Sequence, residues 1–220
     1  MLLDVEDRQK LDPTNDTEFY SVPRFVTHVD EGFIDQLTQL YQERLRPGTR
    51  VLDMMSSWVS HLPDIEFAHV EGHGMNAEEL ARNPRLDHYV VQNLNENPKL
   101  PFADQEFDAV LNCVSVQYIE YPEAIFHEIH RVLKPQGIAI VSFSNRMFYQ
   151  KAITAWRDNS EQGRVELVKR YFESVQHKQM PGFSQPEVIT KPGTTASSFL
   201  QMLGIGGADP FYAVIAHRQK

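Results

Sequence analysis

The chain has 220 residues, 41% of them hydrophobic and 10% aromatic, and this length suits one well-buried domain better than two. Its formal net charge is −9 and no run of lysine or arginine exceeds two residues, which argues against a nucleic-acid partner. The single cysteine, Cys113, cannot form an internal disulfide, and the sequence has neither a signal-peptide pattern nor an apolar stretch of roughly 18 residues, so we expect a cytoplasmic protein without membrane association.

The first 29 residues differ from the rest of the sequence. Residues 1–18 are polar, and we expect them to be loosely packed. Residues 19–25 contain Phe, Tyr, Pro and Phe, a composition suited to a segment that folds over a pocket. We therefore expect an N-terminal arm or lid, residues 1–29, next to a main domain, residues 30–220.

Beyond residue 30, apolar runs alternate with amphipathic stretches. Helical spacing predicts helices over residues 30–45, 76–82, 122–133 and 162–175. Strands are predicted at residues 49–54, 65–72, 88–91, 107–113 and 137–144. Strand-like segments at 181–190 and 209–218, joined by a glycine-rich loop, are expected to form an antiparallel pair. Because strands that alternate with helices indicate right-handed crossovers, the predicted fold class is α/β with a mostly parallel sheet.

Polar and aromatic side chains gather where the predicted strands end. The segments concerned are residues 53–58, 72–76, 92–95 and 112–118. Open parallel sheets bind their ligands beyond the carboxyl ends of the strands, so the sequence predicts a binding site at this edge of the sheet.

The segment from Leu100 to Asn145, LPFADQEFDAVLNCVSVQYIEYPEAIFHEIHRVLKPQGIAIVSFSN, closely resembles the class I S-adenosylmethionine-dependent methyltransferases, in particular their type 11 small-molecule branch. The letters VLD at 51–53 stand where the first motif of that family begins, and the resemblance covers roughly residues 37–217. It implies a Rossmann-like sheet of seven strands with an antiparallel C-terminal strand and helices on both faces. It also implies S-adenosylmethionine as the cofactor and methyl transfer to a small-molecule acceptor.

The sequence departs from that family at several motif positions. The turn after Asp53 reads MMSSW and has no glycine, although glycine usually lets the backbone approach the cofactor there. Gly74 stands where an acid usually accepts the ribose hydroxyls, and Asn93 where an acid usually accepts the adenine amino group. Gln136 replaces a glycine of a distant turn, where it alters only the shape of the loop.

Two explanations of the altered first motif are open. Either the cofactor site has decayed and the chain is a catalytically inactive binding or scaffold protein, or the site has been rebuilt with other residues. The loop favours rebuilding, because the hydroxyls of Ser56, Ser57 and Ser60 can cap a following helix and bind a carboxylate at its positive end. The chain also resembles a subfamily in which MSSWVSHLP occurs together with a segment similar to GHGMNAEELARNPRL.

For a rebuilt site, the resemblance implies that Asp53 orients the ammonium end of the cofactor. Asn76 is expected to bond the ribose, Met75 to pack on the adenine, and Asn93 with the backbone of Leu94 to contact the adenine edge. The alternatives are core packing for Met75 and a turn-capping role for Asn93. The complete set of predicted cofactor-binding residues is Asp53, Met54, Met55, Ser56, Ser57, Gly74, Met75, Asn76, Asn93, Leu94 and Cys113.

Methyl transfer from a sulfonium is an in-line displacement, so the protein supplies alignment and, for a weak nucleophile, a base. The candidate catalytic residues are Tyr20, His28 and Tyr118. The candidate substrate-binding residues are Arg24, Gln117, Asn145 and Arg146. A guanidinium can hold a carboxylate of the cofactor or the substrate, whereas the alternative for either arginine is a solvated surface charge or an ion pair, and for His28 a structural role.

No metal is expected. His127 and His130 are spaced by three rather than the four residues of helical zinc pairs, and we expect both to be solvated. A nicotinamide-dependent oxidoreductase is disfavoured because GxGxxG is missing after the first strand. The expected partner is therefore a small molecule, and the sequence leaves open whether the chain is a monomer or a dimer.

Overall fold

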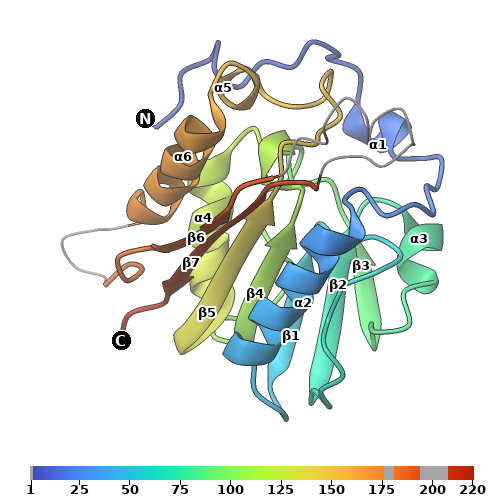
Figure 1. The fold of residues 1–220 in the computed structure, drawn as a ribbon, viewed down its shortest axis with the longest axis vertical. Helices are drawn as coiled ribbons and strands as arrows, with labels where there is room; N and C mark the ends of the chain where they lie inside the picture. Colours follow the sequence, from blue (N-terminus) through green and yellow to red (C-terminus); the bar gives the residue numbers. More distant parts are fainter. Residues whose placement is uncertain (1, 176–180, 194–207) are drawn as a thin grey trace.

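The protein is described by a computed structural model that covers residues 2–175, 181–193 and 208–220. Within these residues one sheet runs in the order β3-β2-β1-β4-β5-β7-β6 (Figure 1). The strands are β1 (Arg50–Met54), β2 (His69–Gly74), β3 (His88–Val91), β4 (Phe107–Cys113), β5 (Leu133–Phe143), β6 (Glu187–Lys191) and β7 (Phe211–His217). The first five are parallel to one another, and β7 is antiparallel to both β5 and β6. The predicted Rossmann-like fold class is confirmed.

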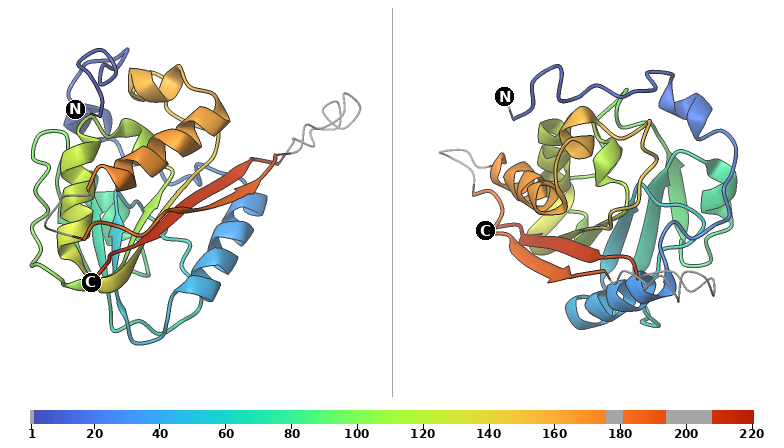
Figure 2. Two further views of the ribbon diagram at one scale, coloured as in Figure 1. Left: turned by 90° about the vertical axis from the view of Figure 1, so that its left-hand side faces the viewer. Right: turned by 45° about the horizontal axis from the view of Figure 1, so that its top comes forward.

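Helices cover both faces of the sheet. They are α1 (Asp16–Phe19), α2 (Glu31–Arg44), α3 (Ala77–Ala81), α4 (Pro122–Val132), α5 (Thr154–Arg157) and α6 (Glu161–Glu173), with a 3-10 turn, η1 (Val116–Tyr118), after β4. The left view of Figure 2 shows α2 on one face of the sheet, with α4 and α6 on the other. No helix in the described ranges is long and apolar enough to cross a membrane.

The helix α2 forms because its start is capped and one of its faces is apolar. The Asp30 carboxylate accepts a hydrogen bond from the Phe33 N–H at 2.8 Å, which satisfies a donor that has no partner inside the helix. Phe33, Leu37 and Tyr41 recur at helical spacing and are at most 1% exposed. They pack against one face of the sheet and thereby fix the helix beside β1.

The segment between β1 and β2 differs from the sequence prediction. We expected the serines after Asp53 to cap a helix, but residues 55–68 contain none. The second strand begins at His69 rather than at residue 65, because the Arg85 guanidinium takes the carbonyl oxygens of Pro63 and Ile65. Those backbone groups are therefore not paired in the sheet.

The C-terminal antiparallel pair is shorter than the sequence predicted. The strand β6 is shorter than the predicted segment 181–190, and Phe183 makes only an isolated bridge with Arg218. The predicted glycine-rich loop between the two strands falls mostly on residues 194–207, which lie outside the described residues.

The N-terminal segment is bound along the domain and is not loosely packed as predicted. The carbonyl oxygens of Asp7 and Gln9 accept hydrogen bonds from the backbone N–H groups of Ala155 and Thr154. Lys151 is 0% exposed, and its ammonium group donates to the Thr14 carbonyl oxygen at 2.6 Å. These partners are far apart in the sequence, so no local pattern could indicate them.

Candidate active site

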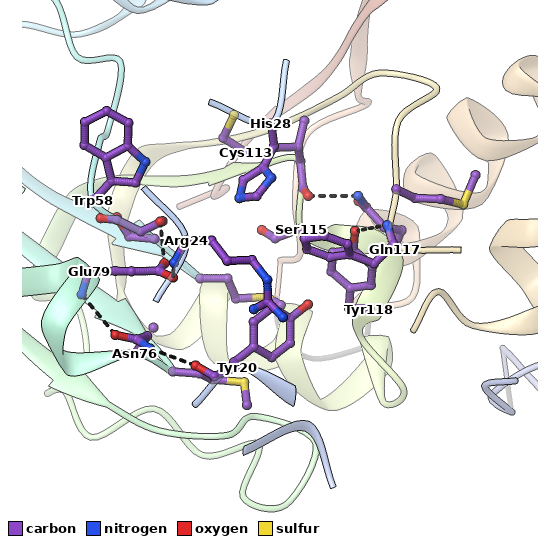
Figure 3. Close-up of a pocket in the computed structure, with 18 of the residues that line it drawn as sticks. Tyr20, Arg24, His28, Trp58, Asn76, Glu79, Cys113, Ser115, Gln117 and Tyr118 are labelled. Carbon is purple, nitrogen blue, oxygen red and sulfur yellow. Dashed lines mark hydrogen bonds between the residues drawn. The ribbon is translucent and has the colours of Figure 1, made fainter. Parts of the chain in front are cut away.

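A cavity of about 590 Å³ lies at the carboxyl ends of β1, β2 and β4. Its walls are the loops after strands β1 to β5 and the part of the N-terminal segment between Asp16 and Val29 (Figure 3). Every predicted site residue lines it except Met54. Side chains alternate along β1, so Met54 points into the core with 1% exposure while its neighbour Asp53 faces the cavity. The prediction that Met54 contacts the cofactor is therefore corrected.

Asp53 is the buried acid of the cavity. It is 5% exposed, and the Ser56 hydroxyl donates a hydrogen bond to its carboxylate at 2.5 Å. Burial raises the pKa of Asp53 from 3.8 to about 6, and hydrogen bonds from the Ser56 and Ser60 hydroxyls oppose this shift. A buried carboxylate with remaining acceptor capacity favours a cationic or N–H-bearing ligand group beside it.

The serines of the loop bind protein groups. Ser57 donates to the Glu79 carboxylate at 2.6 Å, and the Ser60 hydroxyl accepts from the Asn83 side-chain amide at 2.8 Å. Together with the Ser56 contact to Asp53, these bonds hold the loop without glycine. They replace the predicted helix start as the reason for three serines in this stretch.

The position of Gly74 explains why no acid stands at the end of β2. A Cβ atom added at Gly74 would lie 2.6 Å from the Ser56 carbonyl oxygen, which is backbone and cannot move aside alone. The Ser56 N–H also donates to the His73 carbonyl oxygen at 2.7 Å. The serine loop therefore packs across the end of β2 and excludes any side chain there.

Asn76 connects the arm to the domain. Its side-chain oxygen caps α3 by accepting from Glu78 and Glu79 N–H groups, both at 3.0 Å. Its side-chain amide donates to the carbonyl oxygens of Tyr20 and Ser21 at 2.8 and 3.2 Å. The Asn76 side chain lines the cavity, but its oxygen and its amide already have these partners. A hydrogen bond to the ribose, which stays a prediction, would compete with them.

Glu79 is a cavity residue that the sequence reasoning missed. It is 8% exposed, and its two carboxylate oxygens accept the Arg24 backbone N–H and the Ser57 hydroxyl, each at 2.6 Å. It stands three residues after the cap Asn76, the spacing of a capping box, and this pattern could have indicated that it lies near the start of α3. It provides a carboxylate near the end of β2 that motif alignment did not reveal.

The groups predicted to contact an adenine lie together on the cavity wall. Met75 is half-buried and belongs to neither core cluster, which disfavours the core-packing alternative. The Asn93 side-chain oxygen accepts the Asn95 N–H at 3.0 Å, so the turn-capping alternative describes part of its role. Leu94 is 4% exposed, and burial raises the pKa of the Cys113 thiol to about 12, which keeps it neutral and apolar.

The three candidate catalytic residues differ in what chemistry their surroundings allow. Burial raises the pKa of both Tyr20 and Tyr118 above its usual value, so neither phenol gives up its proton easily. The Tyr118 hydroxyl also accepts the Phe148 N–H at 2.8 Å. Burial lowers the pKa of His28 below 6.5, so its imidazole is neutral at pH 7 and able to accept a proton. His28 is therefore the one of the three suited to act as a base.

The predicted substrate-binding residues also separate into two groups. Arg146 is bound to Asp209, whose carboxylate lies 2.7 Å from its Nε, and its side chain is 53% exposed. Asn145 is likewise exposed. Arg24 and Gln117 lie deeper, and the Arg24 guanidinium packs over the Phe19 ring with its Cζ 4.6 Å from the ring centroid. The solvated alternative suits Arg146 better than Arg24.

Two histidines are buried although no sequence pattern indicated it. His73 lines the cavity at 1% exposure, neither of its ring nitrogens has a hydrogen-bond partner within the described residues, and burial lowers its pKa to about 4. His130 was expected to be solvated but is 6% exposed, and its Nε2 lies 2.9 Å from the Pro181 carbonyl oxygen. Within the described residues no group of three His, Cys, Asp or Glu side chains is arranged to hold a metal ion.

Two sequence comparisons relate part of this chain to known proteins. Residues 64–141 match the family model described as a methyltransferase domain. The biotin biosynthesis bifunctional protein BioHC of Teredinibacter turnerae is 27% identical over 124 residues, which are 56% of this chain and 20% of that protein. The chain thus spans about a fifth of the length of this relative.

Solved structures share the fold. An S-adenosylmethionine-dependent methyltransferase from Archaeoglobus fulgidus superposes with a TM-score of 0.56 at 13% identity, over 86% of this chain and 94% of that one. A Haemonchus contortus phosphoethanolamine N-methyltransferase 2, solved with S-adenosyl-L-methionine, superposes with a TM-score of 0.53 at 16% identity. The match covers 84% of this chain and 53% of that one. These structures share the fold, and the domain match over residues 64–141 agrees with the predicted resemblance to class I S-adenosylmethionine-dependent methyltransferases.

Proposed function

We propose that this chain is a class I S-adenosylmethionine-dependent methyltransferase and that it transfers a methyl group to a small-molecule acceptor inside the cavity that the arm covers. The observation that carries the proposal is Asp53, a buried carboxylate at the end of β1 that faces a cavity of about 590 Å³. Cavities of about 300–1,000 Å³ suit ligands of the size of a nucleoside with a small acceptor beside it.

The residues of the cavity fit the cofactor that the class uses. Asp53 would hold its ammonium end, and the half-buried Met75 and apolar Leu94 would form the walls for its adenine. No side chain projects from Gly74, so Glu79 is the nearest carboxylate along the chain that lines this part of the cavity. These roles rest on cavity position and side-chain chemistry.

The proposed reaction needs little from the protein beyond alignment and a proton acceptor. When bound, S-adenosylmethionine supplies a methyl group whose bond to sulfur breaks as the acceptor atom attacks, with the electron pair left on sulfur. His28 would take the proton that a hydroxyl or amine acceptor releases, since burial keeps its imidazole neutral. Tyr20 and Tyr118, whose phenols stay protonated, would position the acceptor.

We further propose the division of the chain into an arm, residues 1–29, and a methyltransferase domain, residues 30–220. The arm supplies Tyr20, Arg24 and His28 to the cavity, and its Val26 carbonyl oxygen accepts from the Trp58 ring N–H at 3.1 Å. Because it covers the cavity, the arm would exclude water from the proposed reaction.

Titration with S-adenosylmethionine and S-adenosylhomocysteine tests the proposal. Both ligands should bind in a calorimeter and raise the melting temperature, because a ligand that binds only the folded state stabilises it. Absence of binding by either ligand would contradict the proposal. Binding of both without labelled methyl transfer to any of a broad panel of small acceptors would favour the alternative, an inactive binding or scaffold protein.

A further inference from the structure

The cavity contains a guanidinium that has no acidic partner among the described residues. Arg24 Cζ lies 4.6, 5.8 and 5.4 Å from the ring centroids of Phe19, Tyr20 and Phe148, so aromatic faces hold the group in place. Its two terminal nitrogens donate to the carbonyl oxygens of Phe19 at 2.9 Å and Val22 at 3.4 Å. An arginine has five N–H donors, so three are left for a ligand.

The neighbouring acid does not neutralise this guanidinium by direct contact. The Glu79 carboxylate accepts the backbone N–H of Arg24 and the Ser57 hydroxyl. Across the part of the chain that the structure describes, no carboxylate oxygen lies within 4.0 Å of an Arg24 side-chain nitrogen, whereas Arg146 at the same cavity is paired with Asp209. A positive charge held in an apolar, partly closed cavity favours an anion beside it.

Two further polar groups belong to residues that line this cavity. In the part of the chain that the structure describes, the Gln117 side-chain oxygen and the Ser115 hydroxyl have no hydrogen-bond partner, and the residues are 1% and 8% exposed. Gln117 donates its side-chain amide to the Val114 carbonyl oxygen at 2.8 Å, which fixes its orientation (Figure 3). Its oxygen and the Ser115 hydroxyl have almost no accessible surface, so a ligand contacts them only after the side chains shift. Their burial without partners costs free energy.

Building on the proposed function, we propose that the methyl acceptor is a small aromatic acid that carries a hydroxyl or amino group. Its carboxylate binds the Arg24 guanidinium, and its ring packs among Tyr20, Tyr118 and Phe148. Its hydroxyl or amino group, the methylated atom, donates to the His28 imidazole. The aromatic rings around the guanidinium account for the flat apolar body, and the His28 ring, whose centroid lies 5.4 Å from that of Phe148, accounts for the protic group.

Matched pairs of carboxylates and amides test this assignment. The probes are benzoate, 3-hydroxybenzoate and 4-hydroxybenzoate, each compared with its uncharged amide by calorimetry at saturating S-adenosylhomocysteine. We expect at least one hydroxybenzoate to bind about tenfold or more tightly than its amide, because a charge-assisted bidentate contact is lost in the amide. If no carboxylate binds more tightly than its amide, the assignment is wrong.

Variants separate this inference from the proposed function. Arg24→Gln should reduce the carboxylate preference to about onefold while S-adenosylhomocysteine affinity stays within about twofold of the wild type, and Arg24→Lys should keep part of the preference. Arg46→Gln is the matched control, because Arg46 is exposed and, within the described ranges, its side chain donates to the carbonyl oxygens of Glu43 and Leu45. Loss of S-adenosylhomocysteine affinity in Arg24→Gln would place the guanidinium at the cofactor and overturn the inference. Failure of the wild type to bind S-adenosylhomocysteine would instead refute the proposed function.

Discussion

Replacing Lys151 with methionine is expected to detach the N-terminal arm and to destabilise the protein strongly. The Lys151 ammonium group is fully buried, lies 3.3 Å from the Asp12 carboxylate and 3.4 Å from that of Asp16, and donates to the Thr14 carbonyl oxygen at 2.6 Å. Methionine keeps the apolar stem of the side chain and removes the charge and all three donors. The change therefore isolates the polar contacts from packing.

The expected loss of stability depends on the two carboxylates that lose Lys151 as a partner. Breaking a buried ion pair by removal of one partner costs about 3–5 kcal/mol. Asp16 keeps Lys10 as a partner at 2.5 Å, and the Asp12 side chain is 25% exposed and can be hydrated, so the lower end applies. We expect a loss of about 3 kcal/mol in the free energy of unfolding, which for a chain of this size lowers the melting temperature by about 6–12 °C.

Urea unfolding followed by circular dichroism measures this loss, and limited proteolysis reports detachment of the arm. Lys169→Met is the control, because the Lys169 side chain is 27% exposed and pairs with Glu166 on the same helix face, a contact worth about 0.5 kcal/mol or less. The reasoning is refuted if Lys151→Met unfolds within about 1 kcal/mol of the control.

Three further substitutions test the cavity and the beginning of β5. Because the pKa of Asp53 is raised from 3.8 to about 6, its contribution to stability is complete below about pH 4 and falls by about 3 kcal/mol as the pH rises through 6. At pH 8 Asp53→Asn should therefore unfold at higher urea than the wild type while losing cofactor affinity, and unchanged calorimetric affinity would contradict its role. Gly74→Ala should push the backbone of Ser56 away, lower the free energy of unfolding by about 1–3 kcal/mol and weaken cofactor binding. Gly32→Ala is the control, because the Cβ added there meets a side-chain atom at 3.5 Å. Gln136 has φ 69°, so Gln136→Gly should raise the unfolding free energy by about 0.5 kcal/mol in urea, whereas Gln136→Ala should bring no gain.

The sheet, and the edge of it at which the cavity lies, could be predicted because the sequence patterns that indicate them are local. Apolar strands that alternate with amphipathic helices fix the layer arrangement, and the predicted strands at 88–91 and 107–113 coincide with β3 and β4. The polar residues after the strands then meet at one edge through the topology alone. This is why Asp53 and Cys113, far apart in sequence, could both be placed at the cavity in advance.

The contacts that close the cavity could not be predicted. Asn76 and Glu79 bind the arm through backbone groups of Tyr20 and Arg24, and any residue in the arm offers the same N–H and carbonyl groups. Phe148 contributes a ring from a loop that has no motif of its own. Nor did the sequence distinguish a serine loop that caps a helix from one that binds Asp53, because both use the same hydroxyls.

The bond between Lys151 and the Thr14 carbonyl oxygen joins residues that are 137 positions apart. During synthesis the arm is made before the rest of this domain. Lys151, the buried cation that binds it, is made much later, after the strands β1 to β5 at whose ends the cavity lies. Strands β1 to β5 can therefore pair before Lys151 is made, and only then can Lys151 fix residues 12–16 of the arm. A chain that stops before Lys151 would have five of the seven strands and an arm held over the cavity only by contacts such as those of Asn76 and Glu79.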